Sequence, residues 1–217
     1  MGWGVQQNEA FPQVIEEMTG TKTLNAGIAS YGTVREMMML DRIDTSGLKY
    51  LIIQYNDNDF EENKAFYEQG QLQTSSYEAY QRICNFQGKL SRYYPGKNLT
   101  LIWRGLQRKI SNPLRIPQND LTGLRDADYF LHALRHATKV DLSHVNIVVI
   151  GTIGFCDRLS DKIKSSDQPS YVHSIKVEEI YSQISDDMVI SLDGHWDARG
   201  HALVADKVIK IISDPPL

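Results

Sequence analysis

Residues 50–59 read Tyr-Leu-Ile-Ile-Gln-Tyr-Asn-Asp-Asn-Asp, a short apolar run that ends in consecutive amide and acid side chains. The first five residues, 50–54, have the length of a strand and the apolar character of one buried on both faces. Similar runs occur at residues 24–28, 145–150 and 188–192, and segments of helical period lie between them. This alternation predicts an α/β fold in which helices cover both faces of a doubly wound parallel sheet.

Three helices are predicted next to these strands. Residues 9–18 place apolar side chains at helical spacing and are followed by Gly20, a residue that commonly ends helices. Residues 33–40 form a second helical pattern, and residues 199–212 form a third with one apolar face. They supply the layers that the predicted sheet needs.

Residues 60–143 make a connection far longer than most links between strands. Helical patterns at residues 77–93 and 121–138 identify it as a helical insertion within a single domain of residues 1–217. The insertion is rich in aromatic side chains, which either shape a substrate pocket or are ordinary core and surface rings. These are Tyr67, Tyr77, Tyr80, Tyr93, Tyr94 and Trp103.

The composition of the chain argues against several classes of protein. The chain has 217 residues, a formal charge of -4 and a pI near 5.9, with mixed signs that suit neither nucleic acid nor anionic lipid. Cys84 and Cys156 are too few for a disulfide framework and indicate ordinary thiols. No apolar run has the length of a membrane span. As written the chain is cytoplasmic, but a signal or anchor preceding Met1 would change that, so its localisation stays open.

Three polar clusters follow predicted strands, where open α/β sheets bind their ligands. The first, residues 25–33, reads Asn-Ala-Gly-Ile-Ala-Ser-Tyr-Gly-Thr. Backbone N–H groups at such a turn, including that of Ser30, can bind an anion or a developing oxyanion. The alternative is a plain turn between a strand and a helix.

The second cluster, residues 54–59, places amide and acid side chains at the end of an apolar strand. Such groups need solvent, a ligand or a polar network, because burying them without partners costs free energy. A calcium loop is the competing interpretation. Counting from Asp57, however, Glu62 falls where an EF-hand loop requires glycine.

The third cluster, residues 193–201, contains Asp193 and His195. A histidine that acts as a general base needs a carboxylate to fix its tautomer, and Asp193 is placed to supply it. Alternatively, Asp197 is a helix N-cap and both His195 and His201 are structural. A zinc site is disfavoured because the two histidines are six residues apart and no third ligand lies near them in sequence.

Together and in this order, the clusters resemble the later motif blocks of the SGNH (GDSL-like) hydrolases, a flavodoxin-like family of esterases and lipases. The resemblance implies that Ser30, at the family's glycine position, and Asn58 form the oxyanion hole. It also implies that Asp193 and His195 are the acid and base of a triad that uses no metal or cofactor. The implied substrate is a small-molecule, carbohydrate or lipid ester.

The family's first block, which carries the nucleophilic serine, has no counterpart here. Residues 2–5, Gly-Trp-Gly-Val, resemble the segment that follows the nucleophile in relatives, yet no Gly-Asp-Ser occurs anywhere in the chain. We therefore expect the first central strand and the serine to lie upstream of Met1, and this chain to be inactive alone. A sheet without that strand would aggregate or borrow a strand in a homo-oligomer.

Two other functions remain open. One is a non-catalytic module that binds a glycan or another ligand in the same crevice. The other is an enzyme with an internal nucleophile, either Ser30 or Ser191, although Ser30 lacks the strained elbow expected of a nucleophile.

Overall fold

The computed structural model describes residue 2 and residues 4–56, 58–72, 76–91, 125–165, 167–190 and 194–213. The longer elements in chain order are α1 (Phe11–Thr19), α2 (Thr33–Leu40), β1 (Tyr50–Gln54), α3 (Asp59–Gln69), α4 (Tyr77–Ser91), α6 (Asp126–His136), β2 (Asn146–Gly151), α7 (Ile153–Ile163), β3 (Lys176–Glu179) and α9 (Ala198–Ser213). The shorter ones are η1 (Gln7–Glu9), α8 (Ser170–His173), η3 (Tyr181–Gln183) and η4 (Asp186–Met188).

Three parallel strands form the sheet, in the order β1-β2-β3. Tyr50 of β1 is aligned with Asn146 of β2, and Val148 of β2 with Lys176 of β3. The central strand β2 is apolar and buried from its second residue onward, as a strand covered on both faces should be. The α/β class and the parallel sheet are thus confirmed.

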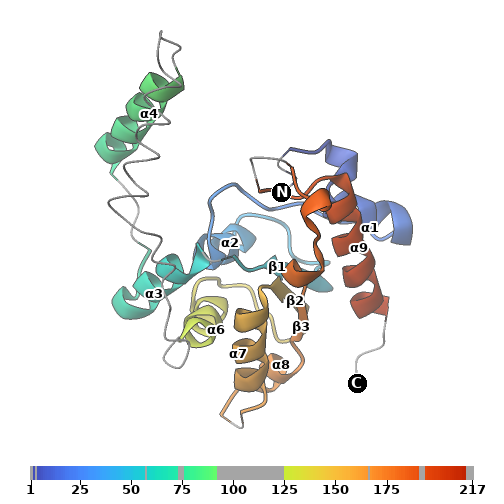
Figure 1. Ribbon diagram of the computed structural model, residues 1–217. Coiled ribbons are helices and arrows are strands. Elements are labelled where there is room, and N and C mark those ends of the chain that lie inside the picture. Colours follow the sequence, from blue (N-terminus) through green and yellow to red (C-terminus); the bar gives the residue numbers. More distant parts are fainter. Residues whose placement is uncertain are drawn as a thin grey trace. The chain divides into compact units, whose positions relative to one another are not determined.

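Helices cover both faces of this sheet (Figure 1). Side chains alternate along β2, so Ile147 and Val149 join a core formed with α2, α3, α6 and α7. Val148 and Ile150 face the opposite way and pack in a second core with α1 and α9. The two layers place the amino- and carboxyl-terminal helices together on one side of the sheet.

The predicted helices beside the sheet are confirmed to within about two residues. α1 ends at Thr19 and is followed by Gly20, whose φ of 67° is the left-handed conformation that glycine tolerates. α2 has the predicted bounds, and α9 differs from its predicted range by one residue at each end. The predicted strand 50–54 is β1, and the strand 145–150 is β2 shifted by one residue.

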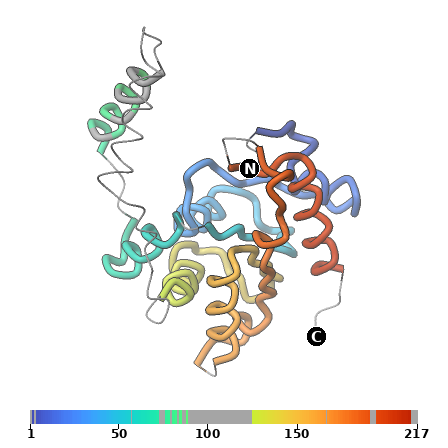
Figure 2. Tube along the Cα trace, viewed as in Figure 1, coloured from blue at the N-terminus to red at the C-terminus, as the bar shows by residue number. Residues whose placement is uncertain are grey.

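The predicted strand at residues 24–28 is wrong. This segment is coil between α1 and α2 (Figure 2), and Leu24 is 66% exposed. Its backbone bonds locally instead of to a neighbouring strand, since the Gly27 N–H donates to Asn25 Oδ1 at 3.3 Å. Apolar composition alone cannot make a strand without a partner backbone.

The predicted strand at residues 188–192 is also wrong for the part that the structure describes. Met188 ends η4, and Val189 forms an isolated antiparallel bridge with Trp196. Ile190 N–H donates to the His195 carbonyl at 2.8 Å, so this chain segment folds back on itself. The third strand is instead β3, which the apolar pattern missed because its sequence is Lys-Val-Glu-Glu.

Residues 73–124 form a compact unit separate from the rest of the chain. The structure describes α4 within it, which confirms the predicted helix at 77–93 up to Ser91. α6 confirms the helix at 121–138 in part, while residues 121–124 and the rings of Tyr93, Tyr94 and Trp103 lie outside the described residues. On either side of the unit, Arg125 donates to the Tyr67 hydroxyl at 3.1 Å.

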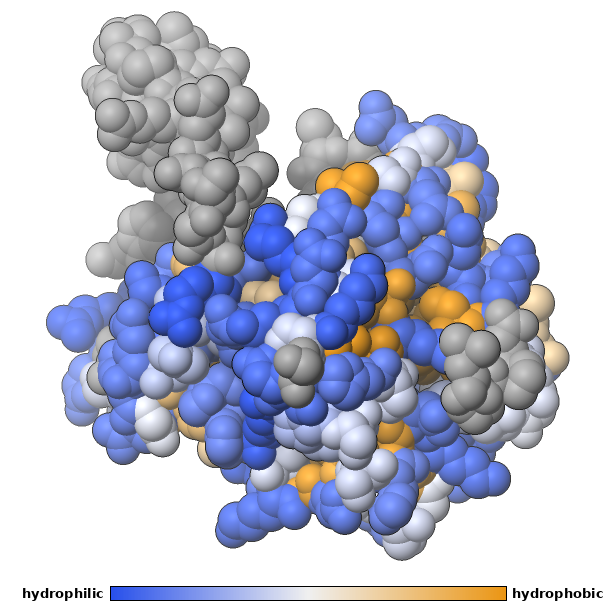
Figure 3. Space-filling view, turned by 90° about the horizontal axis from the view of Figure 1, so that it is seen from below, coloured by the Kyte–Doolittle hydropathy of each residue, from blue (hydrophilic) through white to orange (hydrophobic). Residues whose placement is uncertain are grey.

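The surface is mixed in character. On the face seen in Figure 3, hydrophilic side chains dominate and hydrophobic ones gather in small patches. Among the described helices, none combines the length and apolar character needed to cross a bilayer. Cys156 is buried, and burial raises the pKa of its thiol to about 12, whereas Cys84 is exposed on α4.

Candidate functional site

Contacts bring the three clusters together near the carboxyl edge of the sheet: hydrogen bonds join the first to the second, and the Tyr181 side chain links the second to the third. β1 ends at Gln54 in this region, and β3 ends at Glu179 just before η3. Two sets of hydrogen bonds join the loops that follow. One set centres on Asp59 and the other on Tyr181.

Asp59 fixes the turn after β1. Its backbone N–H donates to the Asn56 carbonyl at 2.9 Å, and its Oδ2 accepts the Asn56 N–H at 2.8 Å. α3 begins at Asp59, so Asn58 lies at the N-cap position, where it is exposed and makes no side-chain capping bond. The Asn58 amide is therefore available to a ligand. Asp57 lies outside the described residues.

The same carboxylate reaches the first cluster. Asp59 Oδ1 accepts hydrogen bonds from the Thr33 N–H at 2.6 Å and from the Thr33 hydroxyl at 2.8 Å. Asp59 is only 1% exposed, and burial raises its pKa while these hydrogen bonds and the one from Asn56 oppose the rise. A buried carboxylate that accepts three hydrogen bonds has a structural role. These bonds account for Asp59 without a calcium ion.

Ser30 has an unusual backbone. Its φ of 63° is the only positive value of a non-glycine residue in the described part of the chain. The left-handed region disfavours a side chain, so the surrounding structure must impose this conformation. Its carbonyl accepts a hydrogen bond from Arg35 Nη2 at 2.6 Å.

Tyr181 joins the second cluster to the third. Its hydroxyl donates to Asn56 Oδ1 and accepts a hydrogen bond from Gln54 Nε2 at 3.1 Å. Its ring lies 5.5 Å from that of Trp196, the residue next to His195. The turn after β1 and the segment that carries His195 are thus held together through one aromatic side chain.

His195 is exposed and follows Gly194, whose φ is 83°. Gly194 N–H donates to the Ile190 carbonyl at 3.2 Å, which keeps the turn tight. The other predicted dyad member, Asp193, lies outside the described residues, as does Ser191. The pairing of Asp193 with His195 therefore stays a prediction.

The remaining residues of the third cluster have structural roles. Asp197 Oδ1 accepts the N–H groups of Arg199 at 2.9 Å and Gly200 at 3.0 Å, so Asp197 caps α9. His201 is 5% exposed, and its Nδ1 accepts the Phe11 N–H at 3.3 Å. The alternative interpretation of these two side chains is correct. In the described ranges, no three His, Cys, Asp or Glu residues are grouped as a metal site.

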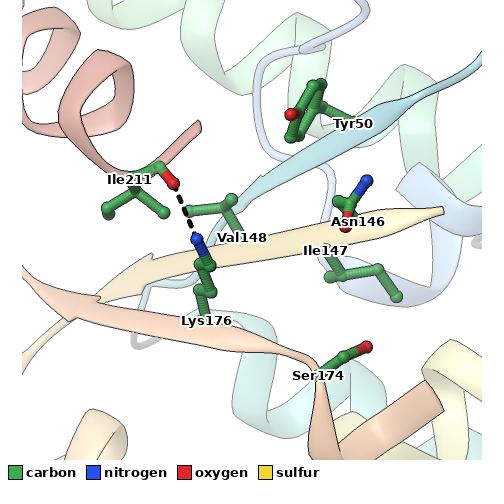
Figure 4. Close-up of a pocket in the computed structure, with 7 residues that line it drawn as sticks. All are labelled: Tyr50, Asn146, Ile147, Val148, Ser174, Lys176 and Ile211. Carbon is green, nitrogen blue, oxygen red and sulfur yellow. Dashed lines mark hydrogen bonds between the residues drawn. The ribbon is translucent and has the colours of Figure 1, made fainter. Parts of the chain in front are cut away.

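A small hollow lies at the opposite, amino-terminal edge of the sheet (Figure 4), lined by Tyr50, Asn146, Ile147, Val148, Ser174, Lys176 and Ile211. Lys176 Nζ donates to the Ile211 carbonyl at 2.8 Å, and the Tyr50 hydroxyl donates to the Ile212 carbonyl at 3.2 Å. Both groups satisfy carbonyls at the end of α9. The side chains that line this hollow therefore hold the end of α9. The hollow is separate from the three clusters.

Two residues that shape the site were missed from the sequence. Asp59 was part of the predicted second cluster, and the expected polar network around it is present, although its partner Thr33 was not predicted. Glu62 and Tyr181 had no such signal, because each acts through a partner distant in sequence: Arg35 for Glu62 and Asn56 for Tyr181.

Comparison with known proteins adds no relative. A scan against models of known protein families finds no match to this chain, and searches of characterised proteins and of solved structures find none either.

Proposed function

We propose that this chain forms most of an SGNH-type serine hydrolase that cleaves carboxylic esters. The observation that carries the proposal is the backbone of Ser30. The SGNH motif has its oxyanion glycine at this position, and Ser30 has the positive φ that glycine adopts readily. Asp59 links the start of the neighbouring helix to the turn that holds Asn58, the second oxyanion donor in the motif.

In the proposed reaction, His195 accepts the proton of a serine hydroxyl while that serine attacks the ester carbonyl. Asp193 fixes the histidine tautomer and stabilises the imidazolium. The Ser30 N–H and the Asn58 side-chain amide stabilise the oxyanion of the tetrahedral intermediate. Each such donor typically lowers the barrier by about 3 kcal/mol. The reaction requires no metal or organic cofactor.

The edge of β1 that faces away from β2 supports a place for the nucleophile. In the described part of the sheet only β2 pairs with β1, although Leu51, Ile52 and Ile53 give β1 the apolar sequence of an inner strand. The other edge strand, β3, carries the charges that protect sheet edges. A further parallel strand beside β1 would end near the three clusters. We propose that a segment outside the given sequence forms it and ends in Gly-Asp-Ser.

This proposal is tested by extending the chain with an apolar strand that ends in Gly-Asp-Ser. The extended protein should hydrolyse p-nitrophenyl acetate. Its matched control, with the added serine changed to alanine, should lose about four orders of magnitude in turnover. A folded, monomeric extended protein with no esterase activity would contradict the proposal and favour the ligand-binding alternative.

The positive φ of Ser30 also bears on the internal-nucleophile alternative, because nucleophile elbows are strained turns too. A fluorophosphonate probe separates the two enzymes. Under our proposal the chain as given is not labelled, and the extended chain is labelled at its added serine. Labelling of Ser30 would instead identify Ser30 as the nucleophile.

A further inference from the structure

We infer that the ion pair between Arg35 and Glu62 is a positioning device that holds the Ser30 amide in the conformation needed to donate to an oxyanion. The inference rests on the proposed function, in which that amide is a donor. Neither Arg35 nor Glu62 belongs to the motif blocks, and neither is assigned any contact with substrate.

Arg35 contacts the turn at two places. Its Nη2 donates to the Ser30 carbonyl at 2.6 Å, and its guanidinium carbon lies 4.7 Å from the centre of the Tyr31 ring. The two contacts hold the carbonyl of Ser30 and the ring of the next residue, Tyr31, against the same guanidinium. Since the Ser30 φ is unfavourable by itself, these contacts offset part of its strain.

Glu62 holds Arg35 in place from α3. Its Oε2 accepts Arg35 Nε at 2.6 Å and lies 2.6 Å from Nη2, while its Oε1 accepts the Arg35 backbone N–H at 3.0 Å. The Glu62 side chain is 11% exposed, compared with 37% for Arg35. Glu62 is therefore the fixed half of the pair, and Arg35 transfers its position to the turn.

Gly32, which has no side chain, allows the Glu62 carboxylate to approach the backbone of the turn. A Cβ added at Gly32 would lie 3.0 Å from Glu62 Cδ and Oε1, closer than ordinary packing permits. The backbone of the turn thus lies directly against the Glu62 carboxylate. Ser30, Gly32, Arg35 and Glu62 form one packed unit, in which the conformation of the amide depends on side chains from two helices.

The inference predicts an observable change in Ser30 that needs no activity. In the ¹⁵N-labelled full chain, Ser30 should show the strong intraresidue HN–Hα NOE of a positive φ. Its amide resonance should also shift on titration with acetate, a carboxylate that mimics the reaction product. In Arg35→Met, the strong NOE and the acetate-induced shift should both be lost. The exposed Arg42→Met is the matched control and should keep both.

Each outcome separates the positioning role from the proposed function. If Ser30 keeps its NOE in Arg35→Met, the positioning role is overturned whatever acetate does. Suppose instead that the Ser30 NOE depends on Arg35 but the wild-type Ser30 amide resonance does not shift with acetate. That result would contradict the role of Ser30 as an oxyanion donor, and the proposed function with it. Should Arg35→Met not fold, Glu62→Gln weakens the same contacts and must reduce the Ser30 NOE. An unchanged NOE there also overturns the inference.

Discussion

Asp59 and Thr33 are 26 positions apart in the sequence, yet the Thr33 N–H and hydroxyl both donate to the same oxygen of the Asp59 carboxylate. The first N–H groups of a helix have no partner within the helix, so a carboxylate at this point satisfies them and interacts favourably with the helix dipole. Asp59 therefore caps α2 while it begins α3. One carboxylate thus ties the start of α2 to the start of α3, beside the ion pair between Arg35 and Glu62.

Replacing Asp59 should destabilise the protein. Asp59→Ala leaves the Thr33 and Asn56 donors without an acceptor, and we expect the free energy of unfolding to fall by about 2 to 4 kcal/mol. Asp59→Asn retains one acceptor oxygen and should lose less. Urea unfolding measures both, with Glu61→Ala, an exposed acid in the same helical turn, as control. Equal losses in Asp59→Ala and Glu61→Ala would contradict the capping role.

Asn58 should affect activity and leave stability unchanged. It is exposed and makes no capping bond, so Asn58→Ala removes no contact that stabilises the fold. In the extended, active protein the substitution should lower turnover of a short-chain ester by roughly a hundredfold or more. The melting temperature should stay within about a degree of the parent, because exposed substitutions rarely change stability much. Near-normal turnover would remove Asn58 from the oxyanion hole.

Glu36, in the first turn of α2, should make stability depend on pH. Burial, with added repulsion from Asp59 and Glu62, raises its pKa from 4.5 to about 8. Between these values the unfolded chain has lost the proton that the folded protein retains, so stability falls as pH rises from about 4.5 to about 8. Glu36→Gln should remove this loss.

The measurement is a comparison of melting temperatures at several pH values. Glu36→Gln should melt at a higher temperature than the parent at pH 7, and the difference should shrink toward pH 4.5. Glu61→Gln, an exposed acid on α3, should show no such trend. A constant difference between Glu36→Gln and the parent at all pH values would show that Glu36 does not retain its proton.

His201 should make stability depend on pH in the opposite direction, with a loss at acidic pH. Burial of the ring lowers the pKa of His201 below its ordinary value of 6.5. A folded-state pKa below the unfolded value means that stability is full above about pH 6.5 and falls as pH drops below it.

Thermal unfolding between pH 7.5 and pH 5 would measure this effect. His201→Phe should flatten the acid-side slope, although it leaves the Phe11 N–H unbonded at a cost of about 1 to 3 kcal/mol. His173→Phe, at an exposed position, is the matched control and should keep the parent slope. An unchanged slope in His201→Phe would exclude His201 as its source.

The fold was predictable where local pattern and tertiary packing agree. Apolar side chains at helical spacing located α1, α2 and α9, and the uninterrupted apolar runs located β1 and β2. The prediction failed where pairing determines the structure. Residues 24–28 have the composition of a strand without a described neighbour to bond, while β3 has a charged composition and a neighbour in β2.

The candidate site was likewise predictable only in part. The motif order identified Ser30, Asn58 and His195, each directly next to a predicted element. The contacts that join them depend on Asp59, Glu62 and Tyr181, whose partners lie between 26 and 125 residues away along the chain. No local pattern can identify such partners, because distance in the sequence does not report distance in space.

The contact between Tyr67 and Arg125 makes the junction of residues 73–124 a permissive insertion point. The chain leaves the sheet domain after Leu72 and returns at Arg125, whose guanidinium donates to the hydroxyl of Tyr67 in α3. The rings of Tyr67, Tyr129 and His132 hold these ends together in α3 and α6. The entropic cost of closing the loop between them changes only slowly with its length. Replacing residues 73–124 should therefore leave the contacts between α3 and α6 in place. A short glycine-serine linker could take their place.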